Sequence, residues 1–387
     1  YELEHMGEHV AWSGSSVRPD PSGERLLSFT GLGTGLLAVP TALLLLPWSG
    51  ESSEIAVLRA NRRGWCSLWL FVGLIAITLP AEFIANDRPL LISSDRGWSV
   101  PVLATYTETD FAGEFETEAD YRDPWFADLI ESQDGWMLWP PIRYGPRTVN
   151  FDLRQPAPSP PSWENWFGTD DQARDVSARL IYGFRISVLF GFCLTFLSSI
   201  IGITAGAVQG FFGGWVDLIF QRLIEIWQGM PTLYLLIILA SLVEPDFFWL
   251  LSLMLLFSWM QLVGVVRAEV LRARNLDFVR AARALGATDL TIMLRHVLPN
   301  AGVAALTFLP FVLTGSVAVL ASLDFLGFGL PAGSPSLGEL LGQGKRNLHA
   351  PWLGLAAFCS LALLLSLLVF IGEAVRDAFD PRRTTGQ

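Results

Sequence analysis

The sequence predicts an all-α polytopic membrane protein, and three observations support this prediction. Hydrophobic residues make up 51% of the 387 residues and charged residues only 16%, with a mean hydropathy of +0.42, which is too apolar for an ordinary soluble protein. Charge-poor runs recur along the chain at about the 20-residue length that a helix needs to cross a hydrocarbon core about 30 Å thick. The arginines gather in the short connections between those runs.

The N-terminal segment 1–58 is set apart from the rest of the chain. Its run at 26–48 is uncharged and long enough to span a membrane, but it contains three glycines and two prolines, and its flanks are acidic. Two alternatives therefore stay open for it, an additional span or a peripheral leader. The letters HMGEH at 5–9 fit a zinc-binding spacing, but they stand at a charged terminus with no scaffold behind them, so we expect no metal site.

Six runs of the rest of the chain are predicted to be membrane spans. They lie at 66–84, within a first segment at 59–85, and at 184–209, 216–243, 248–268, 300–322 and 352–372. The run at 216–243 is the least uniform because its first half holds Asp217, Arg222 and Glu225. Arg222 and Glu225 are three residues apart and can pair on a helix. At membrane depth such a pair would be functional, and at the boundary it would anchor the span, and both alternatives stay open.

An acidic insert at 86–165 separates the first two of these spans. Between Asp87 and Ser177 the chain has 17 Asp and Glu against 7 Arg, a balance of −10 out of the net −11. This segment is expected to be a solvated region outside the membrane, with Trp125, Trp136 and Trp139 offering a small core. An acidic balance argues against a nucleic-acid partner, which needs a basic face.

The orientation follows from the placement of arginine. Three arginines just before the first span, at 59, 62 and 63, put that end in the cytoplasm. Counting spans from there places 86–180 outside, and the arginine-rich connection at 269–299 and the tail 381–387 inside. The three cysteines, Cys66, Cys193 and Cys359, lie far apart in apolar runs and predict neither a disulfide framework nor a metal site.

Two motifs point to close contacts. Gly202, Gly206 and Gly210 recur every fourth residue of one span and are expected to form a bare face against which another helix packs. The second motif is the basic stretch DFVRAARALGATDLTIMLRHVLPNA at 277–301. It predicts two short helices with Gly286 at the bend, Thr288 capping the second helix, and Pro299 at the entry to the next span.

Apolar residues line one side of each short helix. In the first helix they are Phe278, Ala281, Ala282 and Leu285, and in the second Leu290, Met293, Leu294 and Val297. The pattern by itself fits two functions equally, a docking face for a partner protein or an amphipathic helix lying on lipid.

The residue identities of this stretch resemble the cytoplasmic loop of binding-protein-dependent ABC importer permeases. That loop has the pattern Glu-Ala-Ala, three residues, Gly, and later Leu-Pro, and here Ala281-Ala282, Gly286 and Leu298-Pro299 stand at those spacings. Arg280 replaces the common Glu and His296 the common Ile, but the ending RHVLPN resembles the dipeptide and oligopeptide subgroup, where His is usual.

More of the chain carries the same resemblance. FGTDDQARDVSARLIYGFRISVLFG at 167–191 is similar to the entry of that subgroup's transport domain, and LDFLGFGLPAGSPSLGELLGQGKRNLHAPW at 323–352 to its last outer loop. RANRRGWCSLWLFV, FETEADYRDP and WPPIRY resemble, more narrowly, the YejE-type permeases of microcin C and oligopeptide importers. The first 50 residues carry no such resemblance.

The resemblance implies an ABC type I importer permease fold at 166–380, with a coupling loop at 275–299, in a bacterial inner membrane. It implies that Phe278, Ala281, Ala282, Leu285, Gly286, Leu290, Leu298 and Pro299 couple to an ATPase. The implied partners are a second permease, two ATP-binding subunits that use ATP and magnesium, an external solute-binding protein and a peptide-like substrate. GQGKRN at 342–347 lacks the first Gly and the Ser/Thr of a phosphate-binding loop, so we expect this chain to bind no nucleotide itself.

Two other classes of function are weighed against this one. A secondary transporter or channel would have ionisable residues in mid-span and usually an internal repeat, and the predicted spans hold few such charges and no visible repeat. A membrane enzyme would need a convergent set of acid, base or nucleophile at the ends of the spans, and the sequence offers none.

Overall fold

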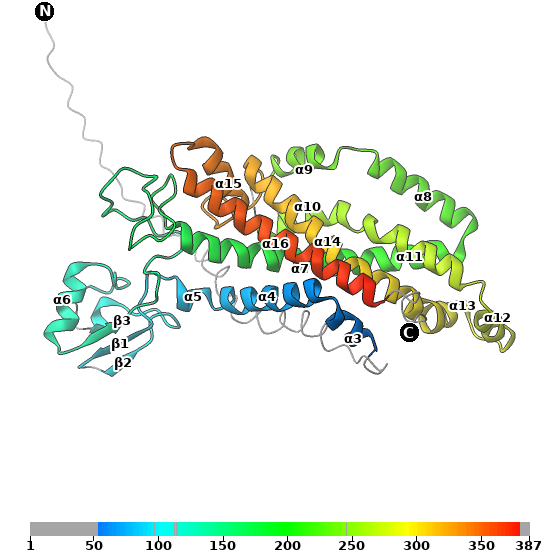
Figure 1. Ribbon diagram of the computed structural model, residues 1–387, viewed down its shortest axis with the longest axis horizontal. Coiled ribbons are helices and arrows are strands. Elements are labelled where there is room, and N and C mark those ends of the chain that lie inside the picture. Colours follow the sequence, from blue (N-terminus) through cyan, green and yellow to red (C-terminus); the bar gives the residue numbers. More distant parts are fainter. Residues whose placement is uncertain (1–52, 96, 112, 114, 245, 380–387) are drawn as a thin grey trace, which may run out of the picture. The chain divides into compact units, whose positions relative to one another are not determined.

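The computed structural model describes residues 53–95, 97–111, 113, 115–244 and 246–379, which belong to one compact unit. The predicted span 26–48, the motif at 5–9 and the tail 381–387 lie outside the described residues. The described chain is mostly helical (Figure 1). Its longer helices are α4 (Arg62–Thr78), α7 (Val176–Phe212), α8 (Gly214–Gln228), α10 (Phe247–Ser258), α11 (Met260–Ala273), α14 (Leu298–Leu326) and α16 (Pro351–Ala378). The shorter ones are α3 (Ser53–Ala60), α5 (Ala81–Ile84), α6 (Pro124–Ser132), α9 (Thr232–Ala240), α12 (Asp277–Ala284), α13 (Asp289–Ile292) and α15 (Leu337–Arg346).

The prediction of a helical membrane protein is confirmed, with fewer unbroken spans than the sequence suggested. Among the described residues, four stretches are long and apolar enough to cross a membrane: α7, α10 with α11, Asp289–Leu326 and α16. The predicted span at 216–243 is divided into α8 and α9, which are bent by 74° across a break that contains Pro231. The one at 66–84 is interrupted at Pro80, and α4 has 17 residues, or about 26 Å at 1.5 Å per residue. Proline explains both breaks because it cannot donate the helical hydrogen bond.

The longest helix, α7, packs against α11 through the predicted glycine face. A methyl group added to Gly206 would stand 2.8 Å from the carbonyl oxygen of Val263 and 2.9 Å from Cβ of Val266. At Gly202 and Gly210 the nearest atoms are the carbonyl oxygens of Trp259 and Arg267, at 2.5 and 2.8 Å. The three glycines therefore let the backbones of the two helices approach more closely than any larger side chain would permit.

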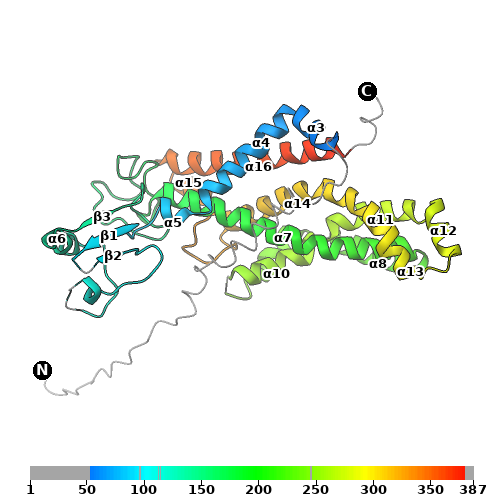
Figure 2. The ribbon, with the colours of Figure 1, turned by 90° about the horizontal axis from the view of Figure 1, so that it is seen from below.

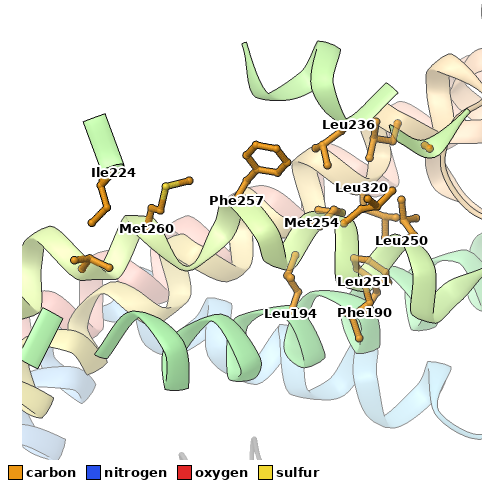
Figure 3. Packing of buried hydrophobic residues seen from close by; sticks show 14 residues of the cluster. Phe190, Leu194, Ile224, Leu236, Leu250, Leu251, Met254, Phe257, Met260 and Leu320 are labelled. Carbon is orange, nitrogen blue, oxygen red and sulfur yellow. The ribbon is translucent and has the colours of Figure 1, made fainter. Parts of the chain in front are cut away.

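The main apolar core lies where α7, α9, α10, α11 and α14 meet (Figure 3). Phe190 and Leu194 of α7 are buried beside Leu250 and Met254 of α10 and Leu320 of α14. A second contact joins α4 to α16, which lie side by side in both views (Figures 1 and 2). The close approach of these two helices needs a glycine at position 64 because a methyl group there would stand 2.1 Å from Cβ of Ala374.

The acidic insert contains a small sheet that the prediction of an all-helical chain did not include. Its strands are β1 (Leu91–Ser94), β2 (Gly97–Ser99) and β3 (Trp136–Leu138), antiparallel in the order β2-β1-β3. A short 3₁₀ helix, Glu108–Phe111, and α6 pack on the face that holds Ile92. The expected tryptophan core is wrong for Trp125 and Trp136, which are exposed. Phenylalanine and tyrosine fill that place instead, with Phe111, Tyr121 and Phe126 mutually in edge contact.

Candidate functional site

The stretch 275–299, called the elbow below, is a sharp bend between two helices, as its sequence predicts. Gly286 has a φ of +82°, in the left-handed region that L side chains rarely adopt, and it ends α12. The amides of Gly286 and Ala287 donate to the carbonyl oxygens of Arg283 and Ala282. The Thr288 hydroxyl then accepts a hydrogen bond from the amide of Thr291 and caps α13.

The base of the elbow is buried against the rest of the chain. Val279, Ile292 and Val297 have no exposed surface. They pack with Phe211 at the end of α7 and with α11, in a cluster that Ala282 and Leu298 flank. The elbow is therefore seated on the ends of α7 and α11, where a displacement of the bend would be passed on to both helices.

The tip of the elbow is exposed and apolar. Leu285 is 89% exposed, Leu290 61%, Leu294 52% and Phe278 40%, and Ala281 is exposed with them. Large apolar side chains in one exposed cluster mark an interaction surface more often than scattered ones do. Pro299 is also exposed, in the first turn of α14.

The predicted stripe of the second short helix is divided between two environments. Met293 and Val297 are buried at the base, whereas Leu290 and Leu294 are exposed at the tip. The physical reason is the π-helical turn Met293–Val297, which follows α13 directly. A π turn holds more than 3.6 residues, so residues that an ideal α-helix would align no longer share one face.

The ion pairs at the elbow are exposed. Arg280 lies 3.0 Å from Asp277, and Arg283 lies 3.1 Å from Asp289, with every one of these side chains more than half exposed. Exposed pairs of this kind contribute only about 0–1 kcal/mol each. They make this part of the elbow surface polar but contribute little to the stability of its conformation.

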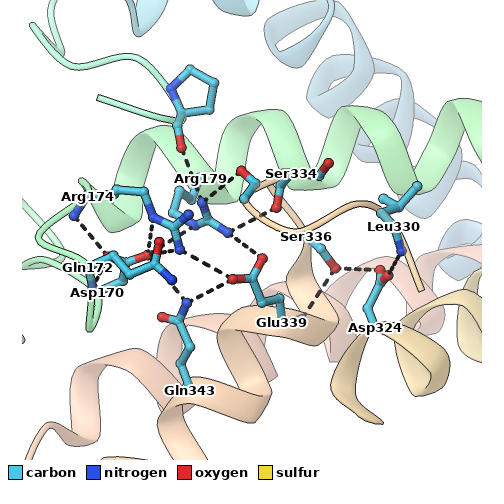
Figure 4. A network of polar contacts seen from close by, with 12 residues as sticks. Asp170, Gln172, Arg174, Arg179, Asp324, Leu330, Ser334, Ser336, Glu339 and Gln343 are labelled. Carbon is cyan, nitrogen blue, oxygen red and sulfur yellow. Dashed lines mark hydrogen bonds and ion pairs between the residues drawn. The ribbon is translucent and has the colours of Figure 1, made fainter. Parts of the chain in front are cut away.

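A second polar group, called the arginine network below, joins the segment before α7 to α15 (Figure 4). Arg179 is fully buried; its Nη2 donates to Glu339 at 2.7 Å and to the carbonyl oxygen of Ser334 at 3.0 Å. Arg174 donates to Asp170 through Nε at 2.7 Å and lies 3.3 Å from Glu339. Gln343 donates to Glu339 at 3.1 Å and completes the network. The contacts of Arg179 and Arg174 with Ser334 and Glu339 join residues more than 150 positions apart.

Burial also affects acids that lie just before α7. It raises the pKa of Asp175, although hydrogen bonds from Asn165 and from the amide of Ala178 partly oppose the shift. It likewise raises the pKa of Asp171, and the neighbouring Asp170 adds to that shift. Asp175 caps α7, with the amide of Ala178 donating to its Oδ1 at 2.8 Å.

The sequence identifies both segments that form this network but does not predict that they contact each other. The segments 167–191 and 323–352 share one family resemblance, and the first contributes Arg174 and Arg179 to the network while the second contributes Glu339. The available signal was that each segment carries charge beside a long apolar run. Within the part of the chain that the structure describes, no group of His, Cys, Asp and Glu has the arrangement of a metal site.

Comparison with known proteins adds the following findings. Residues 198–385 match the family model described as the inner membrane component of binding-protein-dependent transport systems. The chain is 61% identical to the inner membrane ABC transporter permease protein YejE of Escherichia coli, over 84% of this chain and 95% of that protein. It is 57% identical to the peptidoglycan transport system permease protein YejE of Agrobacterium fabrum, over 84% of this chain and 91% of that protein.

A more distant relative covers a smaller share of the chain. The oligopeptide transport system permease protein OppC of Lactococcus lactis is 31% identical over 56% of this chain and 76% of its own length. The similarity to the two YejE proteins extends further along the chain than this and therefore includes residues outside the part shared with OppC.

Proposed function

Because the chain belongs to the family of YejE-type inner membrane ABC transporter permeases, we propose that it forms half of the pathway by which an ATP-driven bacterial importer moves peptides or peptide-like solutes. Membership of this family favours the importer permease over a secondary transporter or a channel. The other half of the pathway belongs to a second, homologous permease. Two ATP-binding subunits bind ATP and magnesium, and a solute-binding protein delivers the cargo from outside.

The observation that carries this proposal is the elbow, with its buried base and its exposed apolar tip. The described part of the chain leaves much of the apolar surface of Leu285, Leu290 and Phe278 uncovered. A partner that covers them buries apolar surface at about 25 cal/mol per Å². Because Val279 and Val297 tie the base to α7 and α11, movement of that partner would be transmitted into the membrane helices.

The proposed orientation places the elbow and the C-terminal end in the cytoplasm and residues 86–180 outside. Its support is the distribution of arginine, which is dense in the elbow and around the start of α4. In this orientation the elbow faces the compartment that supplies ATP, and the acidic insert faces the side from which solute arrives.

The proposed cargo is a solute that contains amino acids joined by amide bonds. Support comes from the relatives, whose names specify oligopeptide transport in one case and peptidoglycan transport in another. Peptides, peptide-containing cell-wall fragments and peptide antibiotics of the microcin C type share this chemistry, and the proposal extends to that shared class.

Substitution of Leu285 by aspartate tests the coupling role. The side chain is almost wholly exposed, so Leu285→Asp should leave the fold of this chain intact. It would place a carboxylate in the apolar contact, at a cost of about 2–5 kcal/mol when that contact forms. We expect uptake of a labelled peptide to be abolished, and the ATP-binding subunits to be lost when the chain is purified in mild detergent.

A matched control is Arg295→Gln, which removes a charge from the same elbow and leaves its exposed apolar side chains in place. The control should transport at the normal rate and retain its partners. Normal uptake by Leu285→Asp, with the protein present in the membrane at the usual level, would refute the coupling role of the elbow.

A further inference from the structure

Helix α8 presents three different sides around its axis. One side faces its own chain, since Ile224 is buried and Asp217 accepts hydrogen bonds from Arg267 of α11 at 2.5 and 2.7 Å. At about 100° per residue, the next side holds the polar residues Gln221, Arg222 and Glu225 and, one turn earlier, the exposed Leu218. The remaining side is apolar and exposed, and its residues are Trp215, Ile219, Leu223 and Ile226.

The polar side carries an ion pair within a helix that is otherwise largely apolar. Arg222 Nη1 lies 2.5 Å from Glu225 Oε2, and Gln221 donates to the other oxygen of Glu225 at 3.3 Å. The arginine and glutamate side chains are 68% and 45% exposed, so the described part of the chain does not bury them. Ionisable residues in a membrane span are costly and almost always face a water-filled cavity or the interior of a bundle.

The break after α8 is a second feature that points to a water-filled space next to this helix. The helix ends at Gln228 and α9 begins at Thr232, with a bend of 74° between them. Gly229 and Pro231 within the break are exposed, so the other described residues do not cover them. At membrane depth, non-helical backbone is tolerated only where protein buries it or where it lines water.

With the start of α8 at the membrane boundary, these features would lie inside the membrane rather than at its edge. At 1.5 Å per residue, Arg222 and Glu225 lie about 12 and about 16 Å along the axis from the first residue of α8, in a hydrocarbon core about 30 Å thick. The break follows about 6 Å beyond Glu225. In that placement, an accessible ion pair and an exposed bend occur together near the middle of one span.

We infer that the polar side of α8, from Gln221 to the break at 229–231, lines the translocation pathway, and that Arg222 and Glu225 bind the carboxylate and the ammonium ends of a zwitterionic peptide. The inference rests on the proposed function, because it assigns a site to that cargo. Guanidinium matches the fork of a carboxylate, and a carboxylate accepts hydrogen bonds from an ammonium group.

The ion pair suits a site that must bind and then release its cargo. Without cargo the two side chains neutralise each other, which limits the cost of keeping them in the membrane. A zwitterion offers the same two charges, so an exchange of partners leaves no charge unpaired. Because an exposed pair is weak, the exchange requires little disruption, and weak binding permits release.

Thiol labelling of the assembled importer tests whether this side of α8 meets water. In a background that carries Cys66→Ser, Cys193→Ser and Cys359→Ser, single substitutions compare Gln221→Cys on the polar side with Ile219→Cys on the apolar side. A charged, water-soluble methanethiosulfonate is applied during turnover with ATP. Since the thiolate is the reactive form and requires water, Gln221→Cys should react at least about tenfold faster. Equal rates, or a faster reaction at Ile219→Cys, would overturn the assignment of the pathway.

Uptake of peptides with blocked ends tests the roles of the two charges. Glu225→Gln should lower uptake of a free tripeptide, at a concentration below saturation, by about tenfold, and that of its N-acetylated form by less than about twofold. Arg222→Gln should discriminate in the same way between the free and the C-terminally amidated peptide. Each result is expressed relative to wild type, so that any preference of the binding protein cancels.

The matched control is Glu269→Gln, because Glu269 pairs with Arg272 at the same spacing on α11, at 3.5 Å. It should leave uptake of all three peptides unchanged. If Glu225→Gln lowers the uptake of free and blocked peptides equally, or changes neither, the recognition of charged ends is wrong although peptide import stands. If wild type and control import no peptide at all, the proposed function itself fails.

Discussion

The two ends of α7 are built in opposite ways. At its first turns the arginine network buries Arg179 completely and holds it with Glu339 and the carbonyl oxygen of Ser334. At its last turns Phe211 packs on the elbow, whose ion pairs are all exposed and whose tip is apolar. With 37 residues, α7 separates these regions by about 55 Å. The difference separates an end of α7 whose charges are buried within the described chain from an end that carries exposed apolar side chains.

The elbow itself repeats this contrast on a smaller scale. Val279 and Ile292 at its base are buried, while Leu285 at its tip is 89% exposed. Close packing is needed for a segment to transmit a displacement, and exposure is needed for a partner to apply one. The elbow meets both requirements because Gly286 turns the chain between them.

The largest expected difference between the two ends concerns the loss of one carboxylate. Asp170 is fully buried and pairs with Arg174 at 2.7 Å and with Arg179 at 3.4 Å. Asp170→Asn would leave two buried arginines with a single acidic partner, so we expect the free energy of unfolding to fall by about 3–5 kcal/mol. The measurement is denaturant unfolding of the purified chain in detergent.

The matched substitution at the elbow is Asp277→Asn, which removes the same charge from the exposed pair with Arg280. Its effect on the free energy of unfolding should stay within about 1 kcal/mol. Similar losses in the two variants would contradict the contrast between a closed and an open end of α7.

An intermediate loss of stability is expected for a substitution in the contact between α7 and α11, which lies between the two ends of α7. Gly206→Val would bring side-chain atoms against Val263 and Val266, which already stand within 3 Å of the position of a Cβ. Overpacking of this kind should cost about 1–3 kcal/mol. Differential scanning calorimetry would detect the loss as a lower melting temperature.

The control for this contact is Gly264→Ala on α11, where a methyl group would meet nothing within 4 Å. Alanine is the better helix former by up to about 1 kcal/mol, so this variant should melt at the same temperature or higher. If Gly206→Val melts like wild type, the glycine face does not determine how closely α7 and α11 approach.

The smallest expected effect concerns pH. Burial raises the pKa of Asp175 above its ordinary value of 3.8, so the folded chain takes up this proton at a higher pH than the unfolded chain. The contribution of Asp175 therefore favours folding at low pH and is lost as the pH rises through the raised pKa. On acidification from about pH 7 to about pH 4, we expect the free energy of unfolding of Asp175→Asn to decrease more, or to increase less, than that of wild type.

The comparison uses the slope of unfolding free energy against pH rather than its level, because asparagine also changes the cap of α7. Parallel slopes for the variant and wild type would show that Asp175 binds no additional proton on folding. That result would weaken the description of this end of α7 as closed to water.

Several features could be predicted from the sequence because short-range chemistry decides them. Only glycine adopts the φ of +82° at Gly286 without strain, so the bend could be placed before the fold was known. Glycines at every fourth residue predict a face for close helix packing whatever the partner is. The apolar runs determine that the chain enters a membrane, because in hydrocarbon each backbone group must be paired within its own helix.

Only the tertiary structure decided which residues meet. Glu339 and Arg179 are 160 residues apart, and no local pattern specifies that they share one buried site. The division of the elbow's stripe depends on a π turn, and the small core of the insert selects Phe111 and Tyr121 over the tryptophans. Which side of α8 faces its own chain is known only from the burial of Ile224 and the contact of Asp217 with Arg267. Sequence determines local conformation and the solvent a segment prefers, whereas the pairing of distant side chains depends on how the helices pack.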